Sequence, residues 1–154
     1  MIKPKVLIIV GSRSDLGVMS KCEEMLAKFR IPYKLEISSA HRNPQKTIQL
    51  AKTAENKGYS LIICGAGMAA HLPGVVASHT ILPVIGVPLV GKYLSGLDSL
   101  LSMAQMPAGV PVATVALGEA GAKNAAILAG EILGLADKNL KRKIERFKKE
   151  LGKS

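Results

Sequence analysis

The sequence predicts a doubly wound α/β domain, in which helices cover both faces of a parallel sheet. Short, continuous apolar runs alternate along the chain with stretches in which apolar residues recur every three or four positions. Such runs are typical of strands buried on both faces, and helical crossovers between them make the sheet parallel. With 154 residues, 48% of them hydrophobic, the chain fits one domain, residues 1–154, with a core over about residues 6–135.

Local signals define the first three strands and the two helices between them. The first apolar run ends at Gly11, and the helix that follows has one apolar face over residues 19–29. Asn43 and Pro44 supply an N-cap and a first-turn proline for the next helix, which Gly58 ends after about residue 57. The strands are expected over residues 6–10, 33–37 and 61–64.

The same alternation continues through the second half of the chain. Pro88 is expected to end the fourth strand, because proline cannot donate a ladder hydrogen bond. The helix expected over residues 122–133 is apolar almost all round. It therefore lies centrally or packs on another subunit, and we expect a homo-oligomer. The other expected elements are strands over residues 84–87 and 112–117 and helices over residues 73–79 and 97–104.

Much of the positive charge belongs to the C-terminal segment. The net charge is +10, and residues 138–154 contain eight basic and two acidic residues. A basic segment suits nucleic acid or an anionic membrane surface, but its apolar residues recur at helical spacing. We therefore predict a solvated basic helix over about residues 137–152, with Asp137 as its N-cap. Its apolar face consists of Leu140, Ile144, Phe147 and Leu151.

Several classes of protein are disfavoured. Aromatic residues make up only 3% of the chain and tryptophan is absent, which disfavours base stacking on exposed rings and hence a nucleic-acid partner. The apolar run of residues 6–10 is far shorter than the roughly 20 residues that span a membrane, so we expect a cytoplasmic protein without a membrane segment. Cys22 and Cys64 lie far apart and the three histidines show no i, i+4 pairing. We expect buried free thiols and no metal site.

Three loops are expected at one edge of the sheet, where the carboxyl ends of parallel strands meet and ligands bind. In the first, Ser12 and the backbone N–H groups of a helix start suit a phosphate, and Asp15 suits the hydroxyls of a sugar. Ser14 and Asp15 are alternatively simple N-caps. The three loops cover residues 11–15, 38–44 and 65–74.

The second loop places an imidazole beside a guanidinium. Arg42 offers bidentate donors to a phosphate, and His41 gains or loses a proton near neutral pH, although such a pair also occurs on plain surface loops. The third loop consists mainly of Gly and Ala, which let backbone N–H groups approach a planar ligand or simply form a tight turn. Taken alone, His71 and His79 are interpreted as structural residues hydrogen-bonded to backbone.

Five motifs occur together and in order in this chain. They are Gly-Ser-x-Ser-Asp (11–15), Ser-Ala-His-Arg-x-Pro (39–44), Ala-Ala-His-Leu-Pro-Gly (69–74), Asp-Ser-Leu followed by Gln-Met-Pro (98–107) and Gly-Val-Pro-Val-Ala-Thr (109–114). Together they closely resemble class I of the PurE family, the N5-carboxyaminoimidazole ribonucleotide mutases that form the catalytic subunit of bacterial phosphoribosylaminoimidazole carboxylase. The resemblance covers roughly residues 6–135.

The resemblance implies a flavodoxin-like three-layer αβα sandwich with a five-stranded parallel sheet, an added C-terminal helix and a homo-octamer. It implies an isomerase that converts N5-carboxyaminoimidazole ribonucleotide to its C4-carboxylated isomer without ATP, metal or organic cofactor. Matching positions place phosphate and ribose contacts on Ser12, Asp15 and Arg42 and the catalytic histidine on His41. The rest of the pocket would be formed by Ser39, Gly67, Met68, Ala69, His71 and Leu72.

In the expected mechanism, His41 first protonates the substrate nitrogen and later removes the C4 proton. One departure concerns Met68, because the common bacterial pattern has a second glycine there, and the pocket for carbon dioxide is then shaped differently. The alternatives are direct carboxylation of aminoimidazole ribonucleotide by carbon dioxide (class II), or a non-enzymatic nucleotide- or RNA-binding module. Animal-type carboxylases resemble Ala-His-Lys and Gly-Arg-Ser-Asn at the two loops, so Arg42 and His71 argue against that class.

Overall fold

The chain forms a five-stranded parallel sheet with helices on both faces, as predicted. A computed structural model describes residues 6–153. The strand order is β2-β1-β3-β4-β5, that of flavodoxin-like folds, and every neighbouring pair is parallel. The strands are β1 (Val6–Val10), β2 (Tyr33–Ile37), β3 (Leu61–Gly67), β4 (Val84–Leu89) and β5 (Ala113–Thr114). The helices are α1 (Leu16–Phe29), α2 (Pro44–Thr53), α3 (Leu72–Ala77), α4 (Leu97–Ala104), α5 (Gly118–Gly134) and α6 (Lys138–Leu151), with 3-10 turns η1 (Arg13–Asp15) and η2 (Leu94–Gly96).

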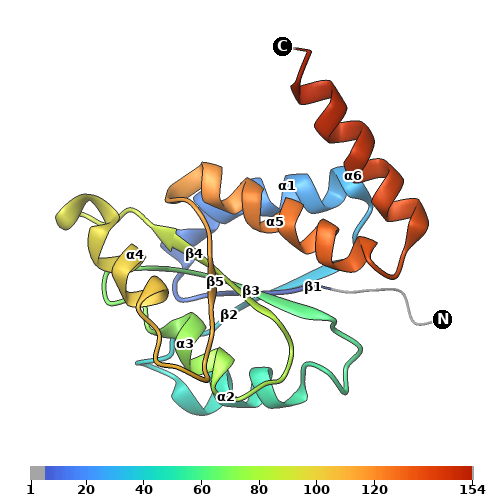
Figure 1. Cartoon of the computed structure of the whole chain (residues 1–154). Helices are drawn as coiled ribbons and strands as arrows, with labels where there is room; N and C mark the ends of the chain where they lie inside the picture. The colour runs from blue at the N-terminus through green and yellow to red at the C-terminus, as the bar shows by residue number, and fades with distance from the viewer. Residues whose placement is uncertain (1–5, 154) are drawn as a thin grey trace.

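Three layers give the domain two hydrophobic cores. Helices α1 and α5 cover one face of the sheet and α2, α3 and α4 cover the other, while α6 packs outside α5 (Figure 1). Alternate residues of β1 supply both cores: Val6, Ile8 and Val10 face the α1 and α5 side, and Leu7 and Ile9 face the opposite side. Because this strand is buried on both faces, its continuous apolar run is what the sheet requires.

The third and fourth strands are longer than the sequence suggests. β3 continues to Gly67, and β4 continues past Pro88 to Leu89, so the prediction that Pro88 ends its strand is wrong. Pro88 pairs in register with Ala66, whereas the pairing of β4 with β5 stops at Gly86. Beyond Gly86 the described residues place no strand on that side of β4, so a proline is tolerated there as on an edge strand.

Other boundaries also shift where tertiary contacts compete with local signals. β5 contains two residues rather than the six expected over residues 112–117. The N–H of Val115 still donates to the carbonyl of Gly86, and the chain then turns into α5 at Gly118. The second helix ends at Thr53, and turns over residues 54–58 replace its expected last turn.

Helix α5 is the central helix of its layer. It packs on α1, on β3 and β4, and on α6. Ala122, Ala125, Ala126 and Ala129 are all fully buried within the single chain. Small side chains let the neighbouring elements approach closely. Because α5 is buried against elements on several sides, it is apolar almost all round. Of the two explanations considered for this helix, the central position is correct, so its apolar surface gives no argument for a subunit contact.

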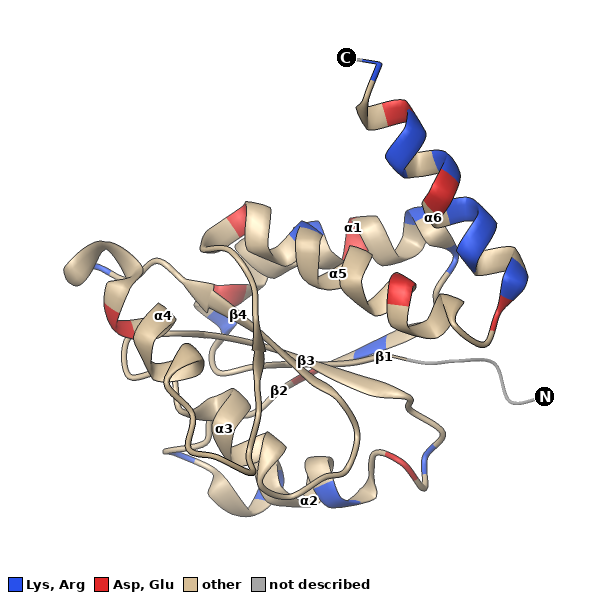
Figure 2. Ribbon diagram, viewed as in Figure 1, with Lys and Arg blue, Asp and Glu red and all other residues tan. Residues whose placement is uncertain are grey.

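The basic C-terminal helix forms where the sequence places it. Asp137 caps it by accepting hydrogen bonds from the N–H groups of Asn139 and Leu140. Leu140 and Ile144 are buried, and Phe147 packs edge-on against Phe29 with the ring centroids 5.4 Å apart. The first three residues of the predicted apolar face therefore pack against the domain, and Leu151 is 57% exposed. Lys and Arg positions recur along the length of α6 (Figure 2).

The two cysteines are buried free thiols, as predicted. Burial raises the pKa of the Cys22 thiol to about 12 and also raises the pKa of Cys64. Over residues 6–153 the structure shows no cluster of His, Cys, Asp and Glu that would hold a metal ion. Within that same range, the helices are too short or too polar to span a membrane.

We predict that Gly121→Ala lowers the free energy of unfolding by about 3 kcal/mol. An added Cβ would lie 1.6 Å from the carbonyl oxygen of Ala116, so the backbone of the β5–α5 connection must move. Gly17→Ala in α1 is the control, because its Cβ would meet nothing within 4 Å and alanine favours a helix by up to about 1 kcal/mol. Urea unfolding of both variants measures the difference; equal stabilities would contradict this packing.

Candidate active site

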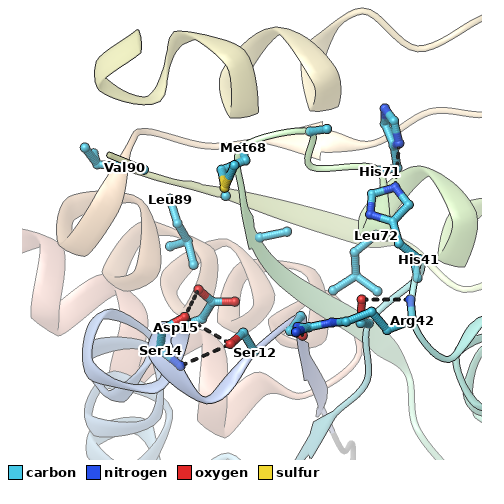
Figure 3. Close-up of a pocket in the computed structure, with 17 residues that line it drawn as sticks. Ser12, Ser14, Asp15, His41, Arg42, Met68, His71, Leu72, Leu89 and Val90 are labelled. Atoms are coloured by element: carbon cyan, nitrogen blue, oxygen red, sulfur yellow. Dashed lines mark hydrogen bonds between the residues drawn. The ribbon is translucent and has the colours of Figure 1, made fainter. Parts of the chain in front are cut away.

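The loops that follow β1, β2, β3 and β4 surround one cavity of about 610 Å³ (Figure 3). The cavity lies at the carboxyl edge of the sheet, beside the point where the strand order reverses between β1 and β3. Ligands of open parallel sheets bind at this point because the two loops diverge to opposite faces. All ten site residues predicted from the sequence line it: Ser12, Asp15, Ser39, His41, Arg42, Gly67, Met68, Ala69, His71 and Leu72.

Ser12 and Asp15 lie on the first turn after β1. The Ser12 side chain caps η1 by accepting a hydrogen bond from the N–H of Ser14, and the Ser14 hydroxyl also donates to it over 3.0 Å. Asp15 precedes α1, but its carboxylate makes no capping hydrogen bond. The interpretation of Asp15 as a simple N-cap is therefore wrong, and its carboxylate is available to a ligand in the cavity.

The Asp15 carboxyl is partly withdrawn from water. Desolvation raises its pKa above the ordinary value of 3.8, while hydrogen bonds from the Ser12 backbone and the Ser14 side chain and the positive charge of Arg42 act in the opposite direction. The net effect is a carboxyl group that takes up a proton more readily than an exposed aspartate. In its ionised form it can accept hydrogen bonds from uncharged hydroxyl groups.

Arg42 is held across the cavity floor between the first two loops. Its guanidinium Nη2 donates to the carbonyl oxygen of Gly11 over 3.2 Å, and its backbone N–H donates to the Ser39 hydroxyl, also over 3.2 Å. Asn43, which follows it, caps α2 by accepting a hydrogen bond from the N–H of Lys46. These bonds at both ends of the residue place the positive charge beside Ser12, where it can bind an anion together with the η1 turn.

His41 and His71 meet in the cavity although 30 residues separate them. The Nε2 atom of His41 lies 2.8 Å from the Nδ1 atom of His71, and the two rings are nearly perpendicular. One nitrogen donates and the other accepts, so a single proton is shared between them. His71 was interpreted as a structural residue bonded to backbone; its side chain instead faces the imidazole of His41. For His79 that interpretation is correct, because its Nδ1 lies 2.9 Å from the carbonyl oxygen of Val75.

The cavity has a further wall that the sequence analysis missed. Leu89, Val90 and Gly91, at the end of β4, also line it. The sequence leaves them unassigned, because Pro88 predicts that the strand ends before them. The signal that could have found them is the same rule that located the other loops, since β4 is parallel to β3 and ends at the same edge.

The arrangement combines two kinds of chemistry in one cavity. The η1 turn, Arg42 and the Asp15 carboxylate offer partners for an anion and for hydroxyl groups, and a pair of imidazoles can transfer a proton. Fold and site together define a flavodoxin-like α/β protein whose cavity suits a phosphorylated small molecule. Comparison with known proteins identifies the group within this class: the model of the AIR carboxylase family matches residues 5–154, and the chain belongs to that family.

Curated relatives resemble the chain over nearly its whole length. A protein of Pyrococcus horikoshii named N5-carboxyaminoimidazole ribonucleotide mutase is 54% identical over 97% of this chain and 83% of its own. Proteins of the same name from Saccharolobus solfataricus and Escherichia coli K12 are 56% and 48% identical, over 96% and 94% of this chain and 92% and 86% of their own. The crystal structure of PurE from Treponema denticola matches with a TM-score of 0.88 and 30% identity, over 97% of this chain and 92% of that one.

Proposed function

We propose that this chain is an N5-carboxyaminoimidazole ribonucleotide mutase acting in purine biosynthesis in the cytoplasm. Membership of the AIR carboxylase family and the shared name of its relatives support the reaction. The observation that carries the proposal is the pairing of His41 with His71 in the cavity that also holds Ser12, Asp15 and Arg42. This pairing supports a proton donor and acceptor within reach of a ligand that is anchored by its phosphate.

The ligand's orientation follows from the chemistry of the cavity. The phosphate binds at Ser12 and Arg42, where backbone N–H groups and a guanidinium converge. The ribose hydroxyls donate to Asp15. The imidazole base then lies against the loop formed by Gly67, Met68 and Ala69, with Ser39 and Leu72 completing the pocket around it.

The reaction needs one group that first gives and then takes a proton. His41 protonates the nitrogen that carries the carboxylate; the C–N bond breaks with its electrons going to nitrogen, and carbon dioxide is released. The electron-rich C4 atom attacks the retained carbon dioxide, and neutral His41 removes the C4 proton to restore the aromatic ring. His71, hydrogen-bonded to Nε2 of His41, positions the ring for both steps. The proposed reaction uses no ATP, metal or organic cofactor.

A homo-oligomer is part of the proposal, and its size of eight subunits comes from the family resemblance. Exposed apolar side chains at the start of η2 and on α4 support self-association: Tyr93, Leu94, Leu97 and Leu101 are between 48% and 69% exposed. These residues follow soon after Val90, which lines the cavity, along the chain. A neighbouring subunit bound to them would therefore lie beside the site. Light scattering at micromolar concentration measures the mass directly.

Two substrates distinguish the proposed function from its alternatives. A mutase forms the C4-carboxylated product from the N-carboxylated ribonucleotide in buffer freed of bicarbonate. A direct carboxylase forms it only from aminoimidazole ribonucleotide with bicarbonate, and a non-enzymatic binding module forms it from neither. Absorbance or mass spectrometry of the product follows both reactions.

We predict that His41→Asn lowers kcat by at least about 100-fold and leaves the fold intact, because asparagine keeps a hydrogen-bonding group but cannot transfer a proton. His79→Asn is the matched control, since His79 bonds to Val75 and Ser78 and does not line the cavity. Its kcat should stay within about twofold of the unaltered protein. Near-normal turnover by His41→Asn would contradict the proposed acid–base role.

We predict that binding of the C4-carboxylated product weakens as the pH falls, and that Asp15 causes part of the loss. Only the ionised carboxylate accepts from both ribose hydroxyls, and its raised pKa brings protonation to a higher pH than 3.8. Asp15→Asn should weaken binding at neutral pH by roughly 10-fold and show a smaller further loss in acid.

Isothermal titration of both proteins between pH 4 and 7 measures this difference. Protonation of the ligand's own phosphate affects both proteins alike, so it cancels in the comparison. Parallel pH profiles of the two proteins would remove Asp15 from ligand binding.

A further inference from the structure

Met68 has an unusual backbone conformation for its residue type. Its φ angle is +57°, in the left-handed region that glycine adopts readily and that residues with a Cβ atom disfavour. Among residues 6–153, the other non-glycine residues with positive φ are Arg30, Leu94 and Ser95, and none of them lines the cavity. A backbone cost is therefore maintained at one residue of the site, and burial does not compensate for it, because Met68 is 55% exposed.

The Met68 side chain is placed where it can cover a ligand. Figure 3 shows the thioether directed into the cavity from the side that faces Asp15 and Ser12. Leu89 and Val90 also line the cavity and add further apolar side chains to its wall. The phosphate-binding side of the cavity is therefore polar, and the side that Met68 covers is apolar.

The neighbouring loop leaves room for this side chain. A Cβ atom on Gly91 would lie 3.2 Å from Cγ of Met68, closer than most Cβ contacts, so glycine keeps the space open. Gly91 follows β4 whereas Met68 follows β3, and the two loops thus meet through the methionine. Methionine has an unbranched chain with three rotatable bonds, so it can change rotamer between these walls without a backbone movement.

We propose that Met68 is an apolar gate that closes over the bound ribonucleotide and retains the carbon dioxide released from it. The inference rests on the proposed mutase reaction. Carbon dioxide is small and uncharged and offers few hydrogen bonds, so it is held by walls that exclude water rather than by polar partners. Between its release from nitrogen and its capture by C4, the mobile thioether closes the exposed side of the cavity.

The gate is tested by following the transferred carbon. The protein is given substrate carrying 13C in its N-carboxylate, in buffer with unlabelled bicarbonate. Mass spectrometry then measures the label in the C4-carboxylated product and the amount of aminoimidazole ribonucleotide set free, after subtraction of a blank without enzyme. Met68→Gly should raise the ratio of freed ribonucleotide to product several-fold and lower the labelled fraction of the product. Met68→Leu, apolar but branched and stiffer, should give an intermediate ratio.

Arg30→Gly provides the matched control. Arg30 has φ +59° at the C-terminal end of α1, so glycine relieves the same kind of backbone strain away from the cavity. This variant should keep the labelled fraction of the unaltered protein, and both glycine variants should keep or raise the melting temperature.

Each result bears on one hypothesis. Unchanged label retention in Met68→Gly, with or without a change in KM, would overturn the gate and leave the mutase reaction standing. Failure of the unaltered protein to convert the N-carboxylated substrate would instead overturn the proposed function. Loss of label in Met68→Gly but not in Arg30→Gly supports the gate, because relief of strain alone does not open the cavity.

Discussion

The pairing of β1 between β2 and β3 is the constraint on which the rest of the structure depends. Five residue pairs in register join β1 to each neighbour, and all three strands run in the same direction. Their carboxyl ends therefore meet at one edge, and their loops emerge together although they come from residues far apart in the chain. Every polar group of the candidate site is carried by a loop that this arrangement positions.

The site departs from the local rules that the rest of the chain obeys. Asn43 and Asp137 cap helices as their positions suggest, whereas Asp15 precedes a helix without capping it. Met68 adopts a backbone conformation that favours glycine. Such departures lower local stability, and they persist because the sheet and both cores hold the loops in place.

Much of the positive charge of the chain lies away from the cavity. Helix α6 carries many of the basic residues and packs near the end of α1, at the opposite edge of the sheet from the site (Figures 1 and 2). Its position follows from its apolar face, which covers α5 and Phe29. At the cavity, an anion is met by Arg42 and by the backbone of η1. The net charge of +10 therefore says little about the ligand.

The sequence by itself determined the elements, the order in which they alternate and the residue types in each loop. Apolar periodicity, caps such as Asn43 and the rule for parallel strands are local signals, and they also placed His41 and Arg42 at one edge of the sheet. Only the tertiary structure decided that β4 continues past Pro88, that α5 is central, and that His71 faces His41. Each of these depends on the packing or hydrogen bonding of residues distant in sequence, and no local pattern records which distant residue will arrive beside another.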